Sequence, residues 1–302
     1  MPVSDLRCFH HSEFPLERLR DARRDTIAVV VPARECAPTI ARVAGELVAL
    51  REAGAVDRVL VVDAASADGT AALARQAGAE VCQEAELAPE TGPVCGKGDA
   101  MWRSLAALSE DVVCFVDGDT EGFERHFALG LAGAVACEEG VRFVKGFFRR
   151  PFRAGDVVLP EGGGRVNELL ARPLLRAWWP ALAGVRQPLA GEIAARRELL
   201  ERLPFVAGYG VEFAMLVDAW REAGAGAIAQ VDLEERQNRH QPLPALAGMA
   251  DAVLAAALSR LAAEGRAAGG DALAVLERPP LASATRLKPQ VGPGTPEASE
   301  VA

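Results

Sequence analysis

The stretch VVCFVDGDT, at residues 112–120, joins a short apolar run directly to two carboxylates. Its first five residues are β-branched, aromatic or otherwise apolar, a pattern typical of a strand buried on both faces of a parallel sheet. Asp117 and Asp119 follow at the carboxyl end of that strand, where open α/β sheets bind their ligands. Side chains two positions apart in an extended segment point the same way, and Gly118 lets the backbone approach a ligand closely.

The two carboxylates have two interpretations on these residues alone. Paired hard oxygen ligands suit Mg²⁺ or Mn²⁺ held against a phosphate, because such ions are commonly bound by one or two carboxylates together with substrate oxygens. Asp-Gly-Asp is also ordinary turn chemistry, since both residue types favour tight turns. Residues 117–119 therefore predict either a metal site or a simple turn.

Strands and helices alternate in the segment that leads to this stretch. Buried strands are expected at residues 26–32, 56–63 and 80–82, and helices at residues 37–54, 71–78 and 97–108. Such alternation requires right-handed crossovers and builds a parallel sheet. We therefore expect an α/β fold with a Rossmann-like sheet over residues 26–120.

The rest of the chain predicts further strands and helices. We expect strands near residues 141–148, 191–197 and 227–236, and helices near residues 165–179, 208–224 and 244–268. The last of these helices is alanine-rich and strongly apolar, so it packs either on its own domain or on a second copy of the chain. The tail from Arg278 is rich in Pro, Ser, Ala and Gly, and we expect disorder there.

Composition limits the functional classes. Half of the 302 residues are apolar, enough for a sizeable core, and the net charge of −9 argues against non-specific binding to nucleic acid. The six cysteines form no CxxC pair, so we expect neither a cysteine zinc site nor a disulfide framework, and we infer a reducing cytoplasm. The N-terminus is charged and His-bearing rather than apolar, and we expect no signal peptide and no stretch near the length of a membrane span.

Four loops are predicted to lie at one edge of the sheet. A nucleoside diphosphate needs a base pocket, a ribose contact, a cation near the phosphates and a metal, and these loops offer each of them. Asp63 in its βα turn is more often a helix-related cap than a ligand contact. The donor-site candidates in the four loops are Pro32, Ala33, Arg34, Glu35, Asp63, Ser66, Lys97, Asp117, Gly118 and Asp119.

Several motifs of the chain resemble one family. PARECAPTI, VVDAASADGT, GKGDAMWRSLAAL and FVDGDT resemble the first half of GT-A glycosyltransferases, whose Asp-X-Asp motif binds a divalent metal and a sugar nucleotide. KGFFRRP, GGGRVNELLARPLL, QPLAGEIAARRELL, PFVAGYGVEF and IAQVDLEERQNRHQPL are similar to the retaining glucosyl-3-phosphoglycerate synthase family, which also contains mannosyl-3-phosphoglycerate synthases. The resemblance spans residues 26–265.

The resemblance implies a GT-A fold in which the nucleotide-binding sheet is continuous with an acceptor-binding region. It divides the chain into an N-terminal arm at 1–25, a nucleotide-sugar-binding half at 26–120, an acceptor-binding half with the C-terminal helix at 121–268, and a flexible tail at 269–302.

The resemblance also implies residue roles. Pro32, Ala33 and Ser66 would line the nucleoside pocket. Lys97 would lie by the nucleotide, and Asp117 and Asp119 would serve the sugar or ribose and the metal.

Two further groups of residues follow from the same resemblance. Gly164, Arg165, Asn167 and Asn238 would bind the phosphoglycerate acceptor, since a glycine loop with an arginine suits phosphate. The Leu189 carbonyl would lie near the anomeric carbon, and Glu192 would hold sugar hydroxyls. Glu192 could instead be structural and pair with Arg196 or Arg197.

Two positions depart from the family pattern. Cys36 stands where the family commonly has a glutamate that contacts the nucleotide, which puts recognition of the base and ribose in question. The metal-binding histidine of the family aligns with Asn238, while this chain has its histidine at His240. Either His240 reaches the metal or Asn238 supplies an oxygen ligand, and imidazole is the commoner ligand.

The implied reaction moves glucose from UDP- or GDP-glucose to the 2-hydroxyl of 3-phosphoglycerate with retention, using Mg²⁺ or Mn²⁺, in a cytoplasmic homodimer. The nearest alternative is the same transfer from GDP-mannose. A sugar nucleotidyltransferase is disfavoured because no LxxGxGxR-type loop is present. An inactive binding module would draw on Cys36 and Asn238, but Lys97, Asp117, Asp119 and Arg165 are intact.

Overall fold

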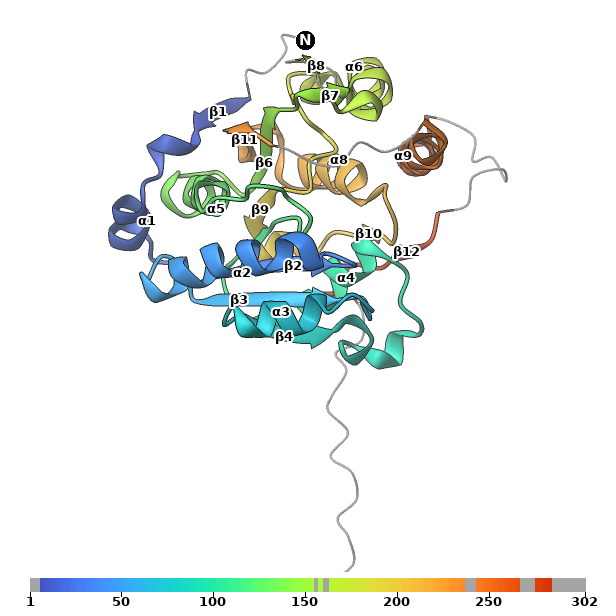
Figure 1. The fold of residues 1–302 in the computed structure, drawn as a ribbon. Helices are drawn as coiled ribbons and strands as arrows, with labels where there is room; N and C mark the ends of the chain where they lie inside the picture. The colour runs from blue at the N-terminus through green and yellow to red at the C-terminus, as the bar shows by residue number, and fades with distance from the viewer. Residues whose placement is uncertain (1–5, 155–156, 160–162, 237–242, 267–274, 284–302) are drawn as a thin grey trace, which may run out of the picture.

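An eight-stranded mixed sheet forms the centre of the molecule (Figure 1). The structure is a computed structural model that describes residues 6–154, 157–159, 163–236, 243–266 and 275–283. Across the sheet the strands lie in the order β1 (Arg7–His10), β11 (Ile228–Glu235), β6 (Phe143–Arg149), β9 (Ile193–Arg196), β5 (Val112–Phe115), β2 (Ile27–Ala33), β3 (Arg58–Asp63) and β4 (Glu80–Gln83).

The directions of the strands bring their functional ends to one edge. All neighbouring strands pair in parallel except β9, which is antiparallel to both β5 and β6. Ile193, the first residue of β9, pairs with Phe115, the last residue of β5. Glu192 therefore lies at the same edge as Asp117. The α/β prediction is confirmed, but the reversed direction of β9 was not predicted.

Alternate side chains of the central strands fill two separate cores. Val29 and Val31 of β2 belong to one core, whereas Ala28 and Val30 belong to the other. Cys114 and Phe115 of β5 divide in the same way, and all of these side chains are at most 1% exposed. The predicted strand at residues 112–116 is therefore buried on both faces, as its unbroken apolar run indicated.

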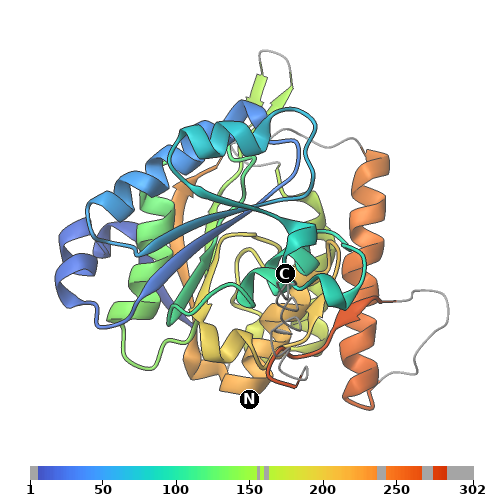
Figure 2. The same ribbon diagram turned by 90° about the horizontal axis from the view of Figure 1, so that it is seen from below.

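Helices cover both faces of the sheet (Figures 1 and 2). One core takes its helical residues from α1 (Leu16–Ala22), α2 (Ala37–Glu52), α3 (Thr70–Gln76) and α5 (His126–Cys137). The other takes them from α4 (Lys97–Leu105), α6 (Arg172–Trp178), α7 (Arg197–Leu200), α8 (Val211–Ala223) and α9 (Leu243–Ala263).

Helix α2 illustrates how the sequence forms these elements. Ile40, Val43, Ala44 and Leu47 recur at helical spacing and are all buried, so one stripe of the helix faces the sheet. The helix ends before Gly54, which has a φ of 75°, in the left-handed region that glycine adopts readily.

Short elements complete the fold. A five-residue π-helical turn (Asn167–Ala171) leads into α6, and the 3₁₀ turn η1 (His11–Glu13) follows β1. Two small antiparallel pairs lie apart from the main sheet: β7 (Phe152–Ala154) with β8 (Val157–Leu159), and β10 (Phe205–Val206) with β12 (Glu277–Arg278).

Both ends of the described chain contact the body of the protein. β1 extends the main sheet by pairing with β11, and β12 pairs with β10. The composition of the C-terminal segment predicted disorder from Arg278, whereas the structure places Arg278 and Pro279 in hydrogen bonds with α4. The expected tail does not begin at Arg278, because its arginine has a buried carboxylate partner. The division into an arm, two halves and a tail stays a prediction.

Helix α9 corrects one expectation. Residues Pro244–Ala263 are long and apolar enough to cross a membrane by length and composition, with a mean hydropathy of 1.5, so the expectation that no stretch approaches that length is wrong. The core helix of a globular domain passes the same test. Arg260 of α9 is buried and pairs with Asp218 of α8 at 2.6 Å and with Glu277 at 2.5 Å. The helix therefore packs on its own domain.

Candidate active site

Charged side chains meet at the carboxyl edge of the sheet. Asp117 follows β5, Glu192 precedes β9, and Lys97 begins α4. The Lys97 ammonium donates to Asp117 Oδ1 at 2.5 Å and to Glu212 Oε1 of α8 at 2.7 Å. One lysine thus connects the predicted Asp-Gly-Asp segment to a helix on the second core.

Arg236, directly after β11, connects three carboxylates. Its guanidinium donates to Asp117 Oδ2 at 2.9 Å, to Asp119 Oδ1 at 3.3 Å and to Glu192 Oε1. The side chain is only 1% exposed and lies over the Phe148 ring at 5.3 Å. Both terminal nitrogens of the fork are thus held by carboxylates, while the buried Nε has no hydrogen-bond partner among the described residues.

The pKa values of two buried carboxylates in this network, Asp117 and Glu192, are shifted in opposite directions. Burial raises the pKa of Asp117, but Lys97 and Arg236 outweigh it and hold that pKa well below its ordinary value. Burial raises the pKa of Glu192 above its ordinary value even with Arg236 beside it. Asp117 is therefore firmly ionised, whereas Glu192 holds a proton more readily than an exposed glutamate does.

The segment at residues 189–191 lies against this network. A Cβ at Gly191 would collide with the Asp117 carboxylate and the Lys97 ammonium, so a larger residue there would displace these two side chains. The Ala190 carbonyl accepts from the buried Lys145 ammonium of β6. Burial lowers the pKa of Lys145 to about 8, although Glu212 and Glu192 oppose that shift. These contacts fix the backbone next to Leu189.

Asp119 is the carboxylate of the pair that faces outward. Its side chain is 66% exposed, whereas that of Asp117 is 19% exposed and has both oxygens bonded to Lys97 and Arg236. An exposed carboxylate beside a second one is a donor set that Mg²⁺ or Mn²⁺ accepts when substrate oxygens complete it. The residues present therefore fit a divalent ion, and the role of Asp119 as its ligand stays a prediction.

Gly118 packs closely against β2, and its predicted approach to a ligand stays a prediction. Its carbonyl accepts from Thr39 Oγ1 at 2.7 Å, and a Cβ there would lie 3.3 Å from both Cys36 Sγ and Val31 Cγ1. The small residue therefore permits close packing against β2 and the loop after it.

The loops after β2 and β3 bind each other. The Glu35 backbone N–H donates to Ser66 Oγ at 2.9 Å, and Glu35 Oε1 accepts from the Ala67 N–H at 2.9 Å. Pro32 and Ala33 lie at the end of β2, and the exposed Arg34 follows them. The residues of these loops that are predicted to bind the donor nucleotide are thus neighbours. The Glu35 carboxylate, however, binds the adjoining loop.

Asp63 caps a backbone turn. Its Oδ2 accepts from the Ser66 N–H and from Gln83 Nε2, each at 3.1 Å. Its buried Oδ1 has no hydrogen-bond partner among the described residues. The predicted contact of Asp63 with a donor nucleotide stays a prediction.

Cys36 places a neutral group where the family resemblance implies a carboxylate. The thiol is buried, and burial raises its pKa to about 11, with Asp119 and Asp117 adding to the effect. The Cys36 side chain lies against Gly118, which is the residue between Asp117 and Asp119 in the sequence. The group that lies beside the Asp-Gly-Asp segment at this position is therefore a neutral thiol.

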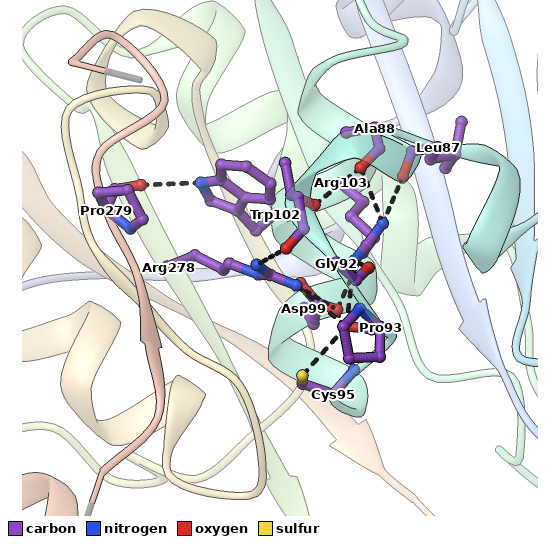
Figure 3. Close-up of polar contacts among 11 residues, drawn as sticks. Leu87, Ala88, Gly92, Pro93, Cys95, Asp99, Trp102, Arg103, Arg278 and Pro279 are labelled. Carbon is purple, nitrogen blue, oxygen red and sulfur yellow. Dashed lines mark hydrogen bonds and ion pairs between the residues drawn. The ribbon is translucent and has the colours of Figure 1, made fainter. Parts of the chain in front are cut away.

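The start of α4, which carries Lys97, is held by buried charges (Figure 3). Asp99 receives Arg103 Nε at 2.9 Å and Arg278 Nε at 2.6 Å. Arg103 also donates to the Leu87 and Gly92 carbonyls at 2.7 Å, and Trp102 donates to the Pro279 carbonyl at 2.9 Å. The loop before Lys97 is therefore fastened to α4 and to the C-terminal segment.

A small cavity lies beside the charged network. It is lined by Arg150, Gly163, Gly164, Asn167, Glu168, Gln187, Leu189 and Ala190. Gly164 and Asn167 are predicted acceptor residues, and Leu189 is a predicted catalytic residue, so the structure brings these three together. Arg165 is not among the lining residues. Asn238 and His240 lie outside the described residues, and their roles stay predictions.

Asn167 connects this cavity to the backbone at Leu189. Its Oδ1 accepts from the Leu189 N–H at 3.4 Å, and its Nδ2 donates to the Arg186 carbonyl at 3.1 Å. The loop that contains Gly164 and the segment that carries the Leu189 carbonyl are therefore positioned by the same amide.

Several known proteins are similar to this chain in sequence. Glucosyl-3-phosphoglycerate synthase from Petrotoga mobilis is 39% identical over 269 residues, with 86% of this chain and 82% of that protein aligned. The enzyme of that name from Mycobacterium tuberculosis is 46% identical over 238 residues, covering 78% of this chain and 73% of its own. The chain belongs to the glucosyl-3-phosphoglycerate synthase family. No protein-family model matches it.

Solved structures of this family have the same fold. The crystal structure of glucosyl-3-phosphoglycerate synthase from Mycobacterium tuberculosis in complex with Mn²⁺, UDP-glucose and phosphoglyceric acid has a TM-score of 0.82 at 39% identity, covering 92% of this chain and 98% of that one. Mannosyl-3-phosphoglycerate synthase from Rubrobacter xylanophilus has a TM-score of 0.85 at 41% identity, covering 93% and 96%. The GT-A fold expected from the sequence is confirmed.

Some residues of this glucosyl-3-phosphoglycerate synthase-like site were missed in the sequence. Arg236, Glu212 and Arg150 each lie inside a motif that carries the family resemblance, but no spacing rule showed that they converge. The alternative in which Glu192 pairs with Arg196 or Arg197 is wrong, because Glu192 pairs with Arg236. The two arginines pair instead with Asp25 and Glu201.

Proposed function

We propose that this protein transfers glucose from UDP-glucose to the 2-hydroxyl of 3-phosphoglycerate, with retention of the anomeric configuration. The observation that carries the proposal is the contact between the two halves of the site. The backbone at residues 189–191 lines the cavity at Leu189 and Ala190 and packs against Asp117 and Lys97 at Gly191. A donor at the charged edge and an acceptor in the cavity would meet at this backbone.

The donor side is built to hold a diphosphate. Asp119, with Asp117 behind it, would hold Mg²⁺ or Mn²⁺, and Lys97 would face the phosphates from the start of α4. When bound, the ion supplies Lewis-acid stabilisation of the leaving diphosphate. The protein contributes positioning and fixed charge, which are the main sources of rate in such transfers.

The acceptor side offers a cation and backbone donors. The Arg150 guanidinium lies over the Phe148 ring at 4.9 Å, and its buried Nε has no partner among the described residues. Gly163 and Gly164 border the same cavity. An arginine beside a glycine loop suits the phosphate and carboxylate of phosphoglycerate, and it supplements the predicted role of Arg165.

Glu192 supports front-face transfer rather than a covalent intermediate. It is fully buried, and its Oε1 is held by Arg236, which limits its access to the anomeric carbon. In front-face transfer the departing phosphate accepts the proton of the acceptor hydroxyl. The Leu189 carbonyl and Glu192 would then orient the sugar.

The names and bound ligands of the relatives support the choice of sugar and nucleotide. Names of the relatives favour glucose over mannose, and relatives crystallised with UDP or UDP-glucose favour UDP over GDP. The six cysteines are free thiols, which supports a reducing, cytoplasmic location. A homodimer is proposed from the family resemblance alone, and light scattering would test it.

Release of nucleoside diphosphate tests the proposed function. Purified protein with Mg²⁺ or Mn²⁺ is given UDP-glucose, GDP-glucose or GDP-mannose, each with and without 3-phosphoglycerate. We expect release from UDP-glucose that depends on phosphoglycerate. Equal release without the acceptor, or none from any donor in folded protein that binds UDP, would contradict the proposal.

A further inference from the structure

Three of the four histidines of the chain lie together near the carboxyl ends of β1 and β11. His10 ends β1, His11 begins η1, and His126 begins α5. The His10 and His11 rings lie 4.4 Å apart between centroids, and the His11 and His126 rings 4.3 Å apart. Figure 1 shows β1, β11 and α5 on the same side of the molecule.

A carboxylate completes the cluster from β11. The parallel register pairs His10 with Asp232, so the residues that follow Asp232 reach the histidines. A bulge follows Asp232, and Glu234 adopts a φ of 66°, with its N–H donating to Asp232 Oδ1 at 2.9 Å. Glu234 Oε1 then lies 3.1 Å from His11 Nε2 and 3.7 Å from His10 Nε2.

These three groups have the spacing of metal ligands. One ligand atom from each of His10, His11 and Glu234 lies within 4.8 Å of the others. Bonds of about 2.0–2.2 Å from a zinc ion to nitrogen and oxygen place neighbouring ligands a little over 3 Å apart in a tetrahedral site. The two distances to Glu234, 3.1 and 3.7 Å, are close to that spacing, and the chosen nitrogens of the two imidazoles lie within 4.8 Å of each other.

The loop after His10 holds its ring. His10 Nδ1 accepts from the Ser12 backbone N–H at 3.3 Å and lies 2.7 Å from Ser12 Oγ. These contacts leave Nε2 facing Glu234, and an ion bound there would displace the Nε2 proton, as metal binding commonly does. His126 is excluded from the set because its Nε2 faces the Leu233 carbonyl at 3.3 Å.

We propose that His10, His11 and Glu234 form a binding site for a divalent transition-metal ion of the zinc class, separate from the site at Asp119. Two imidazoles select such an ion over Mg²⁺ or Ca²⁺, which prefer oxygen. The His10 and Glu234 side chains are 43% and 54% exposed, so water can complete the coordination. The proposal does not depend on the proposed transfer reaction.

Occupancy of this site would fasten the first strand to the sheet. β1 and η1 supply two ligands, and the end of β11 supplies the third, two residues before Arg236. The ion would thus join the N-terminal segment to the strand that carries the central arginine of the charged edge. In its absence, the Glu234 pair with His11 is an ordinary ion pair near the surface, which contributes little.

The test uses Co²⁺ as a spectroscopic probe. Asp119→Ala/His240→Gln protein, freed of metal by chelation and dialysis, removes the competing ligands of the predicted catalytic site. Visible absorption would report binding and coordination geometry. We expect one equivalent to bind saturably at micromolar concentration, and Zn²⁺ to displace it and raise the melting temperature.

Two ligand variants and one control in this background decide the proposal. His11→Gln and the exposed, conservative Glu234→Gln should each weaken Co²⁺ binding at least about tenfold, as losses of coordinating groups do. His126→Gln, which removes the adjacent ring outside the set, should change it less than about threefold. No saturable binding below millimolar Co²⁺, or binding unchanged in both ligand variants, would overturn the proposal.

Discussion

Replacement of Arg236 with methionine should remove the central cation of the charged network. Methionine fills a similar length of apolar space over Phe148 but cannot donate to Glu192, Asp117 or Asp119. Glu192 is fully buried and would lose the cation that holds its carboxylate. Asp117 keeps Lys97, and the exposed Asp119 gains water. The main cost therefore falls on Glu192.

The expected magnitude follows from that burial. Removal of one partner from a buried ion pair typically costs about 3–5 kcal/mol. The contact with Asp119 adds little, because its side chain is 66% exposed. At about 2.1 cal/mol/K of unfolding entropy per residue, a chain of 302 residues loses about 5–8 °C in Tm.

The loss should depend on pH in a defined direction. The pKa of Glu192 is already above its ordinary value, and removal of Arg236 raises it further. A carboxyl with a raised folded-state pKa stabilises the protein at low pH, and that contribution is lost as the pH rises from the ordinary value through the folded-state value. The deficit of the variant should therefore narrow as the pH falls from about 8 towards 5.5.

Urea unfolding followed by fluorescence measures these differences. Arg149→Met is the matched control, because Arg149 is exposed at the end of β6 and should change the free energy of unfolding by less than about 0.5 kcal/mol. The double variant Arg236→Met/Glu192→Gln should recover at least half of the deficit. A deficit below about 1 kcal/mol, or one that stays constant between pH 5.5 and 8, would refute the reasoning.

Three further variants test separate parts of the site. Asp119→Ala should abolish metal-dependent turnover with an unchanged Tm, and near-normal turnover would exclude Asp119 as the metal ligand. Arg150→Gln should raise the KM for phosphoglycerate while leaving the Kd for UDP unchanged, and an unchanged KM would remove Arg150 from the acceptor site. Arg278→Gln leaves the buried Asp99 with one arginine, so it should lower Tm and raise the KM for UDP-glucose through Lys97. Normal values of both would show that the C-terminal segment does not position α4.

Local sequence patterns were sufficient for most of the fold. The apolar runs at β2, β3 and β5 and the helical spacing in α2 each reflect burial of the same chain segment, so they can be recognised without its neighbours. The direction of β9 could not be predicted in this way, because four residues of IAAR carry no information about the strands on either side. β1 was missed for a related reason: its side chains are only partly buried, so they lack an apolar pattern.

The site was predictable where one segment carries the chemistry. Asp117, Asp119 and Lys97 each follow or precede a recognisable element, and the structure brings them to one edge. Arg236 and Arg150 are long side chains whose partners lie on other strands, so their roles depend on tertiary packing. The role of Glu192 depends on the antiparallel β9, which places it beside Asp117 rather than at the opposite edge.

The product of the reaction tests the central claim most directly. Protein with Mn²⁺ is incubated with UDP-glucose labelled with ¹³C at the anomeric carbon and with 3-phosphoglycerate, and the product is followed by NMR. We predict a single new α-anomeric signal correlated with carbon 2 of phosphoglycerate, which forms only when the acceptor is present. A β-anomeric product, attachment at another position, or labelled free glucose as the main product would contradict the account.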